Sequence, residues 1–171
     1  MRSIWAIRSG SPVDGSAPEA LAASAPGGRQ GGVPVVQTAS LLQVLLVDDS
    51  PTNLQNTGDL LSQWGIVPTT ACNGAEALAL ASERQFDIIV MDVAMPIMDG
   101  LEATQLIRQL EIEHPERPRT PIVAYTTGWL LADTGLLAQV GFDEANDKPC
   151  SADQLKACLR RWSLTKPVLL S

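Results

Sequence analysis

The chain has few basic residues and no long hydrophobic run. Its 171 residues include 12 lysines and arginines against 19 aspartates and glutamates, which gives a net charge of −7. Binding to nucleic acid requires clustered basic side chains, so this balance argues against nucleic acid as a direct partner. No apolar segment is long enough to span a membrane, and the N-terminal sequence MRSIWAIRSG lacks the apolar run of a signal peptide.

Cysteine and histidine are also scarce. The three cysteines, Cys72, Cys150 and Cys158, are odd in number and lack the spacing of a metal site. They predict reduced thiols in a cytoplasmic protein, and we expect them to be small buried hydrophobic residues. The single histidine, His114, lies in a polar stretch and is expected to face solvent.

Glycine, alanine, serine and proline dominate residues 9–36, which have neither a helix nor a strand period. Such a composition cannot bury enough apolar area to offset chain entropy, so it predicts a flexible linker. We therefore divide the chain into a linker or tail (1–40), one folded domain (41–165) and a short C-terminal tail (166–171).

From residue 41 onward, five short strand-like segments alternate with five helical ones. Three of the strand-like segments, 43–47, 86–91 and 121–126, are continuously apolar, as expected for central strands covered on both faces. Segment 66–71 contains Pro68 and segment 142–146 is polar, so both are predicted at sheet edges. The alternation predicts an α/β, flavodoxin-like (βα)5 fold, with a doubly wound parallel sheet in strand order 2-1-3-4-5.

Turn and cap residues mark the predicted helix ends. We expect N-terminal caps at Ser50 (before Pro51), Asn73, Asp99 and Ser151, a stop at Gly65, and a weaker helix over 129–140 interrupted by Gly135. Trp64 and Trp162 lie on apolar helical faces and are expected to pack in the core, whereas Trp129 is placed to flank a cleft or an interface.

Charged and hydroxyl side chains follow the predicted strands, at the sheet edge where parallel α/β folds bind ligands. Asp48 and Asp49 end the first strand, Asp92 ends the third, Thr126 ends the fourth, and Lys148 follows the fifth. Two carboxylates about 5 Å apart repel by roughly 3 kcal/mol at an effective dielectric of about 20, so three of them call for a cation. Oxygen ligands favour Mg²⁺, with Mn²⁺ as an alternative.

These side chains form a set suited to phosphoryl chemistry. We expect Asp49 and Asp92 to bind the metal directly and Asp48 to act through water. Asp92 can attack phosphorus while Lys148 and a hydroxyl from Thr126 stabilise the developing charge. Asp99 is expected to cap the next helix and not to bind the metal.

The stretches LLVDDSPTN, DIIVMDVAMPIMDG, PIVAYTT and DKP, in this order, resemble the receiver domain of two-component response regulators over residues 43–163. The resemblance implies that Asp92 accepts a phosphoryl group from a phosphohistidine on a histidine kinase or phosphotransfer domain. It implies that Asp48 and Asp49 are the acidic pair holding the metal, and that Ala94 gives it a backbone carbonyl. Thr126 would be the switch hydroxyl and Lys148 the phosphate-binding lysine.

The sequence departs from that family at Ala145, where many receivers carry an aromatic residue that moves on phosphorylation. Tyr125 is a poor substitute, because adjacent strand residues face opposite ways. We therefore expect the signal to be relayed by ordering of the segment 127–140.

With a linker before the folded domain and a short tail after it, the chain resembles the C-terminal receiver of a hybrid histidine kinase. In that setting the domain is cytoplasmic, either free or tethered to a membrane-bound kinase, makes no membrane contact itself, and is a monomer or weak dimer. The face of the first helix around Leu54, Gln55 and Gly58 would dock a phosphotransfer helix. The domain would be a signalling module and not an enzyme, beyond weak self-dephosphorylation.

Three other functions compete with this interpretation. A phosphatase of the haloacid-dehalogenase type carries a second acid two residues after its nucleophile, where this chain has Ala94. A flavin-binding flavodoxin needs a phosphate-cradling loop after the first strand, where this chain has the acidic DDSPTN. A degenerate receiver that only binds proteins would not need Asp49, Asp92, Thr126 and Lys148.

Overall fold

A computed structural model describes residues 42–128 and 134–162 of the chain. Strands and helices alternate, as the sequence predicts. The elements are β1 (Val44–Val47), α1 (Pro51–Gln63), β2 (Thr69–Ala71), α2 (Gly74–Glu83), β3 (Ile88–Asp92), α3 (Gly100–Glu113), β4 (Ile122–Thr126), α5 (Thr134–Val140), β5 (Glu144–Asp147) and α6 (Ala152–Trp162).

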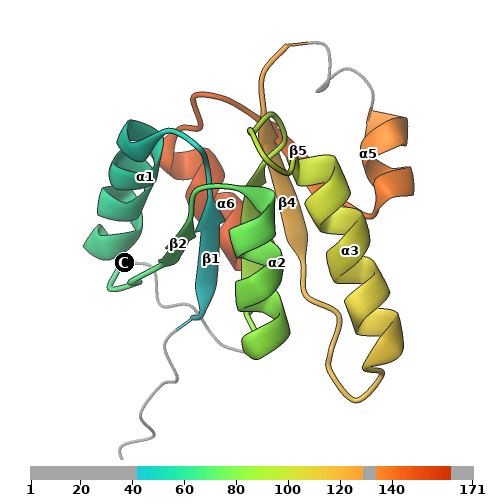
Figure 1. The fold of residues 1–171 in the computed structure, drawn as a ribbon. Helices are drawn as coiled ribbons and strands as arrows, with labels where there is room; N and C mark the ends of the chain where they lie inside the picture. The colour runs from blue at the N-terminus through green and yellow to red at the C-terminus, as the bar shows by residue number, and fades with distance from the viewer. Residues whose placement is uncertain (1–41, 129–133, 163–171) are drawn as a thin grey trace, which may run out of the picture. The chain divides into compact units, whose positions relative to one another are not determined.

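The five strands form one parallel sheet in the order β2-β1-β3-β4-β5, which confirms the predicted topology (Figure 1). β1, β3 and β4 are buried along their whole length. β2 directly follows Pro68 and lies at one edge, and the polar β5 lies at the other. Apolar strands therefore occupy the centre because both of their faces are covered by helices.

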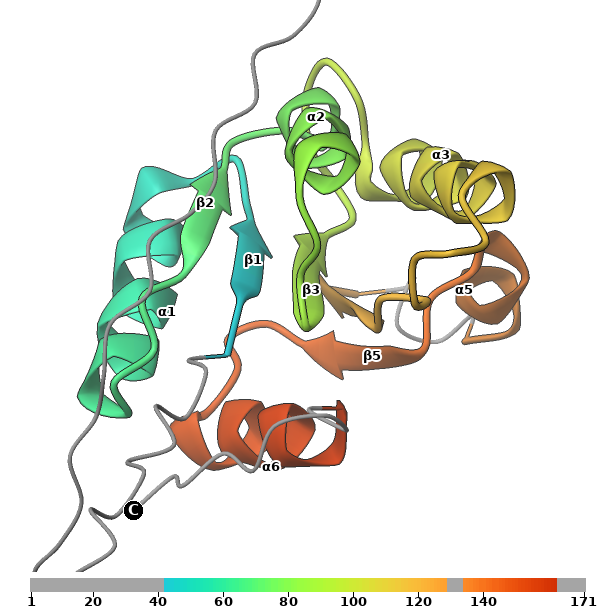
Figure 2. The same ribbon diagram turned by 90° about the horizontal axis from the view of Figure 1, so that it is seen from below.

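Helices cover both faces of the sheet and enclose two separate hydrophobic clusters. α1 and α6 cover one face, whereas α2, α3 and α5 cover the other (Figure 2). Alternate residues of β1 divide between the clusters, with Leu45 under α2 and α3 and Leu46 under α1 and α6. This period of two is the alternation expected of a strand buried on both sides. Trp64 and Trp162 pack against the cluster under α1 and α6, as predicted.

α1 begins and ends where its sequence indicates. The Ser50 hydroxyl accepts a hydrogen bond from the amide of Asn53, and Pro51 is the first helical residue. Gly65 adopts φ +73°, and the amides of Gly65 and Ile66 donate back to the carbonyls of Ser62 and Leu61. This is a Schellman ending, and it uses the Ile66 amide, so β2 starts at Thr69 and not at residue 66.

The other predicted caps are also present. Asp99 caps α3 by accepting from the Glu102 amide at 2.8 Å. Ser151 and Gln154 exchange two hydrogen bonds at the start of α6, which is a complete capping box. Asn73 caps α2.

The predicted helix over 129–140 is only partly seen. Its described part, α5, spans Thr134–Val140 and includes Gly135 as its second residue. Residues 129–133, including Trp129, lie outside the described residues, as do the predicted linker (9–36) and the C-terminal tail (166–171).

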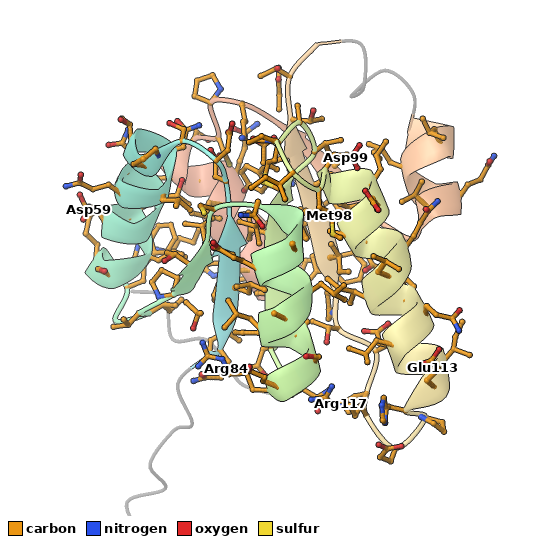
Figure 3. The ribbon with its side chains drawn as sticks, in the orientation of Figure 1. Asp59, Arg84, Met98, Asp99, Glu113 and Arg117 are labelled. Atoms are coloured by element: carbon orange, nitrogen blue, oxygen red, sulfur yellow. The ribbon has the colours of Figure 1, made fainter. Side chains whose placement is uncertain are left out.

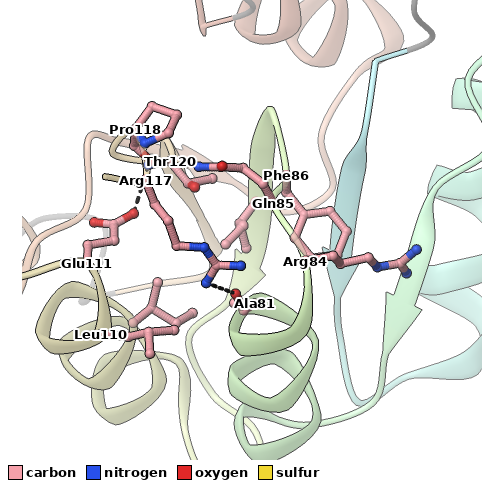
Figure 4. A pocket seen from close by; sticks show the side chains of 11 residues that line it. Ala81, Arg84, Gln85, Phe86, Leu110, Glu111, Arg117, Pro118 and Thr120 are labelled. Atoms are coloured by element: carbon pink, nitrogen blue, oxygen red, sulfur yellow. Dashed lines mark hydrogen bonds between the residues drawn. The ribbon is translucent and has the colours of Figure 1, made fainter. Parts of the chain in front are cut away.

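Two further observations bear on where a ligand could bind. Near the ends of α2 and α3 that lie far from the carboxyl edge of the sheet, a cavity of about 20 Å³ lies beside Arg117, which donates to the carbonyl of Ala81 (Figure 4). That volume has room for about one water molecule and excludes a larger ligand. Within residues 42–128 and 134–162, no helix has the length and hydrophobicity needed to cross a bilayer.

Candidate functional site

Three carboxylates meet at the carboxyl edge of the sheet. One carboxylate oxygen each from Asp48, Asp49 and Asp92 lie within 4.8 Å of one another. Asp48 and Asp49 follow β1, and Asp92 ends the neighbouring strand β3. Asp48 and Asp92 are buried, whereas Asp49 is exposed. The sequence thus correctly predicted that these three residues come together.

Lys148 reaches into the same place from the loop after β5. Its ammonium nitrogen lies 2.6 Å from an oxygen of Asp48 and 2.7 Å from an oxygen of Asp92. The backbone amide of Lys148 donates to the carbonyl of Thr126 at 3.0 Å, which fixes the start of this loop against the end of β4. One cation therefore bridges two buried carboxylates, a pairing that low local polarity strengthens.

Asp48 is held by more partners than the sequence indicated. Its oxygens accept from the Ser50 amide at 2.9 Å and from the side-chain amide of Asn53 at 3.1 and 3.2 Å, in addition to Lys148. Asn53 was not predicted as a site residue. A signal was available, because a side chain in the first turn of α1 lies close to the strand end that precedes the helix.

The electrostatics of Asp92 reflect its burial. Desolvation raises the pKa of the Asp92 carboxyl, and the hydrogen bond and charge of Lys148 oppose that rise, while the charge of Asp48 adds to it. The Ala94 amide also donates weakly to Asp92, at 3.3 Å. The net direction is upward, so the ionised form of Asp92 is destabilised relative to a solvated aspartate. A bound cation would relieve this cost.

The loop between β3 and α3 packs closely against Asp92. The Gly100 amide donates to the Val93 carbonyl at 2.9 Å, and a Cβ atom at position 100 would lie 2.1 Å from the carbonyl oxygen of Asp92. Only glycine fits this approach. The next-to-last residue of the loop, Met98, lies between α2 and α3, and Asp99 stands at the start of α3 (Figure 3).

Thr126 and its neighbours complete the cleft. Thr126 is the last residue of β4 and is buried, one step beyond the register position where Tyr125 pairs with Asp92. Tyr125 belongs to the cluster under α1 and α6, and its hydroxyl lies 2.9 Å from the Cys150 sulfur. Ala145 packs against the opposite cluster. Tyr125 and Ala145 therefore lie on opposite faces of the sheet, in keeping with the expectation that Tyr125 is a poor substitute for an aromatic residue at position 145.

The donor set suits Mg²⁺. Two oxygens on opposite sides of this ion are about 4.2 Å apart, which is within the 4.8 Å that bounds the separation of these three carboxylate oxygens. The carboxylate of Asp49 has no hydrogen-bond or ion-pair partner within the described part of the chain, whereas Asp48 has several. A hard, oxygen-only site with one free carboxylate fits a small divalent cation and does not fit a soft metal.

The cysteines behave less uniformly than predicted. All three are free. Cys158 is buried and Cys150 is partly buried, as expected, but Cys72 is exposed at the end of β2. The prediction was wrong for Cys72. Its thiol donates a hydrogen bond to the Glu76 carboxylate at 3.1 Å and does not pack in the core. His114 is exposed as predicted and lies 3.2 Å from Glu116.

Comparison with protein families and with curated proteins gives consistent matches. The family model "Response regulator receiver domain" matches residues 44–160. The sensor histidine kinase GacS of Pseudomonas protegens is 39% identical over 121 residues, which cover 71% of this chain and 13% of that protein. BarA, a signal transduction histidine-protein kinase of Escherichia coli K12, is 33% identical over 131 residues, covering 76% of this chain and 14% of that protein. The chain thus spans about an eighth of the length of these relatives.

Solved structures give the same result. The receiver domain of the sensor histidine kinase PA1611 from Pseudomonas aeruginosa, with a magnesium ion in its active-site cleft, is 31% identical with a TM-score of 0.64, covering 72% of this chain and 98% of that one. A chain from the co-crystal structure of the yeast phosphotransfer protein Ypd1 and the receiver domain of Ssk1 is 27% identical with a TM-score of 0.67, covering 72% of this chain and 89% of that one.

Proposed function

Because this chain belongs to the response regulator receiver family of two-component phosphorelay proteins, we propose that Asp92 is the residue that accepts the phosphoryl group. The observation that carries the proposal is the position of Asp92, buried at the end of the central strand and 2.7 Å from the Lys148 ammonium. No other described carboxylate combines the end of a central strand, burial and contact with a lysine on a different loop, apart from Asp48, which several donors already hold.

In the proposed reaction, an oxygen of Asp92 forms a bond to phosphorus as the phosphorus–nitrogen bond of a phosphohistidine breaks. The imidazole leaves with the electron pair of that bond. Lys148 pairs with the oxygens of the transferred group, the Ala94 amide donates to the same site, and Thr126 supplies a hydroxyl nearby. Mg²⁺, when bound, neutralises charge on the transferred oxygens, and Mn²⁺ is an alternative.

Asp49 and Asp92 would bind the metal directly, with Ala94 contributing its carbonyl. Asp48 would act through water, because the hydrogen bonds from Ser50 and Asn53 and the contact with Lys148 already engage both of its oxygens. The different burial and bonding of the two neighbouring aspartates support this division of roles.

The phosphoryl donor would be a histidine phosphotransfer domain or a histidine kinase, as the match to the complex of Ypd1 with the Ssk1 receiver domain supports. The docking face would include α1 around Leu54, Gln55 and Gly58, since of its thirteen residues only Leu61 is buried. We place the domain in a hybrid histidine kinase as a cytoplasmic monomer or weak dimer, with weak self-dephosphorylation and no contact with nucleic acid. The exposed free thiol of Cys72 is in keeping with a reducing compartment.

The output would travel through the segment 127–140, because Ala145 offers no aromatic ring to move. Within its described part, Leu137 and Val140 anchor α5 in the core. Amide hydrogen exchange of this segment should slow when beryllofluoride mimics the phosphoryl group. Unchanged exchange there would contradict this route.

The acceptor is tested by intact mass spectrometry after incubation with Mg²⁺ and phosphoramidate. We expect wild-type protein to gain one phosphoryl group, about 80 Da by its formula, and Asp92→Asn to gain none. Asp99→Asn is the matched control, because Asp99 is the helix cap in the same loop and should still permit phosphorylation. An adduct on Asp92→Asn, or none on wild type, would refute the assignment.

A further inference from the structure

The outer surface formed by α2 and α3 contains a groove that the phosphorylation site does not use. The two helices run side by side on one face of the sheet (Figures 1 and 2). The groove has a volume of about 510 Å³. Its lining is mainly aliphatic, and we call it the α2–α3 groove, formed chiefly by Ala75, Leu78, Ala79, Met98, Leu106 and Leu110.

The lining residues recur at helical spacing on both walls. Ala75 and Ala79 are four apart on α2, and Leu106 and Leu110 are four apart on α3. Leu106 is 38% exposed. Two parallel apolar stripes with a channel between them are the receiving surface that an amphipathic helix needs.

Exposed apolar surface continues from the groove toward the cleft. Ile97, which immediately precedes Met98, is 85% exposed and has φ +73° at the centre of a γ-turn closed by the Met98 amide and the Pro96 carbonyl. A β-branched residue in this backbone region is an outlier, and glycine or asparagine would fit better. The packing of the described residues gives no reason for an isoleucine at this exposed position.

Acidic side chains flank the groove. Glu83 ends α2, and Glu102 lies in the first turn of α3. Glu113 ends α3, at the far end of the groove from Met98 (Figure 3). All three are exposed, and none takes part in the salt bridges formed among residues 42–128 and 134–162. At the Glu113 end, Arg117 donates to the Ala81 carbonyl, and Arg84 contacts Thr69 and Phe86 (Figure 3). The Met98 end, where Glu102 lies, is therefore the more acidic end of the groove.

These features restrict the occupant. The backbone groups of both walls are hydrogen-bonded within helices, so no strand can add to them. Phosphate-rich surfaces such as membranes or nucleic acid would be repelled by the glutamates, and a second copy of this groove would oppose acid to acid. A helix with lysine or arginine beside its apolar stripe would pack against the aliphatic lining and would be attracted by the glutamates. The walls are about 15 Å and 21 Å long at about 1.5 Å per residue, which fits a helix of roughly 10–14 residues.

We propose that the α2–α3 groove docks an amphipathic helix of a partner protein, with aliphatic anchors at i, i+3 or i+4, and i+7 and basic residues on either side. The inference goes beyond phosphoryl acceptance, because none of the cleft carboxylates lines the groove.

The test uses a fluorescein-labelled 14-residue peptide of leucine and lysine in helical order, with binding followed by anisotropy. Leu106→Gln should weaken binding about tenfold, the value of burying roughly one leucine side chain. Val67→Gln is the matched control, since Val67 is 81% exposed but lies outside the groove. Equal weakening by both variants, or no saturable binding to wild type, would overturn the proposal.

Two further comparisons test the charge and the loop. Glu102→Gln should weaken binding about threefold at low salt, whereas Asp59→Asn, which removes an exposed carboxylate from α1, should not (Figure 3). Ile97→Asn should weaken binding while raising the melting temperature, which separates a lost contact from a damaged fold. A peptide of the same composition in alternating order should bind at least tenfold more weakly than the helical one. If it binds as tightly, the groove does not select a helix.

Discussion

The ammonium of Lys148 lies 2.7 Å from a carboxylate oxygen of Asp92, and both groups are largely buried. Removing the charge of Lys148 and removing the charge of Asp92 should change the free energy of unfolding in opposite directions. Lys148→Met leaves two buried carboxylates uncompensated and should lower the free energy of unfolding by about 2–3 kcal/mol in the absence of metal.

Asp92→Asn should have the opposite effect. Burial already raises the pKa of this carboxyl, so its ionised form is costly, and Lys148 keeps Asp48 as a partner when Asp92 is neutral. We expect a gain of about 1 kcal/mol at pH 7 without metal, measured for both variants by urea denaturation. A loss of stability in Asp92→Asn would mean that the ion pair outweighs desolvation.

Divalent cations should stabilise the folded protein. At a Mg²⁺ concentration one hundred times the dissociation constant, the gain is about 2.7 kcal/mol by mass action, seen as a rise in melting temperature. Asp49→Asn should remove most of that rise, because Asp49 supplies the free carboxylate of the cleft. Asp59→Asn, on the exposed side of α1, is the control that should retain it.

Two glycine substitutions should differ in sign. Gly100→Ala would force its Cβ to within 2.1 Å of the Asp92 carbonyl oxygen, and we expect a loss of more than about 3 kcal/mol. Gly58 lies within α1, where the nearest atom to an added Cβ is 3.9 Å away. Gly58→Ala should therefore raise stability by about 0.5–1 kcal/mol in the same denaturation assay. Equal effects would mean that the loop after β3 relaxes freely.

Thr104 offers a test of core polarity. Its hydroxyl is the one buried side-chain oxygen or nitrogen without a hydrogen-bond partner among residues 42–128 and 134–162. Thr104→Val keeps the shape and removes the unsatisfied group, so we expect a rise of about 1 kcal/mol. Thr104→Ala removes a methyl group as well and should be less stable than the valine variant. If valine is the less stable of the two, the hydroxyl has a partner in solution.

The reactivity of Cys72 should depend on Glu76. The hydrogen bond to Glu76 is the largest of the effects that raise the pKa of this thiol. A raised pKa leaves less thiolate, so iodoacetamide should modify Cys72 at pH 8 more slowly than it modifies a cysteine in an unfolded peptide, and the rate should rise with pH. Glu76→Gln removes the negative charge and should speed modification at pH 8. An unchanged rate would show that the carboxylate does not control the thiol.

Most of the fold followed from patterns along the chain. The apolar runs of β1, β3 and β4 predicted the centre of the sheet, because only strands covered on both faces need them. Asp48, Asp92 and Lys148 could be brought together from sequence because parallel strands end at one edge.

What sequence could not predict depended on contacts between distant segments. β2 starts three residues later than expected, because the Ile66 amide is used to end α1. The bridge from Lys148 to both Asp48 and Asp92 required the loop geometry. Nothing in MPIMDG marks Ile97 for a positive φ, since isoleucine is a poor residue for that conformation.

The close approach of Gly100 to the Asp92 carbonyl affects how mutational data on this protein should be interpreted. In a saturation screen scored on signalling, position 100 would tolerate as little change as position 92, although glycine brings no chemical group to the reaction. Scoring the same library for protein abundance separates the two positions. Asp92→Asn variants should remain abundant and inactive, whereas variants at Gly100 should be lost from the soluble pool.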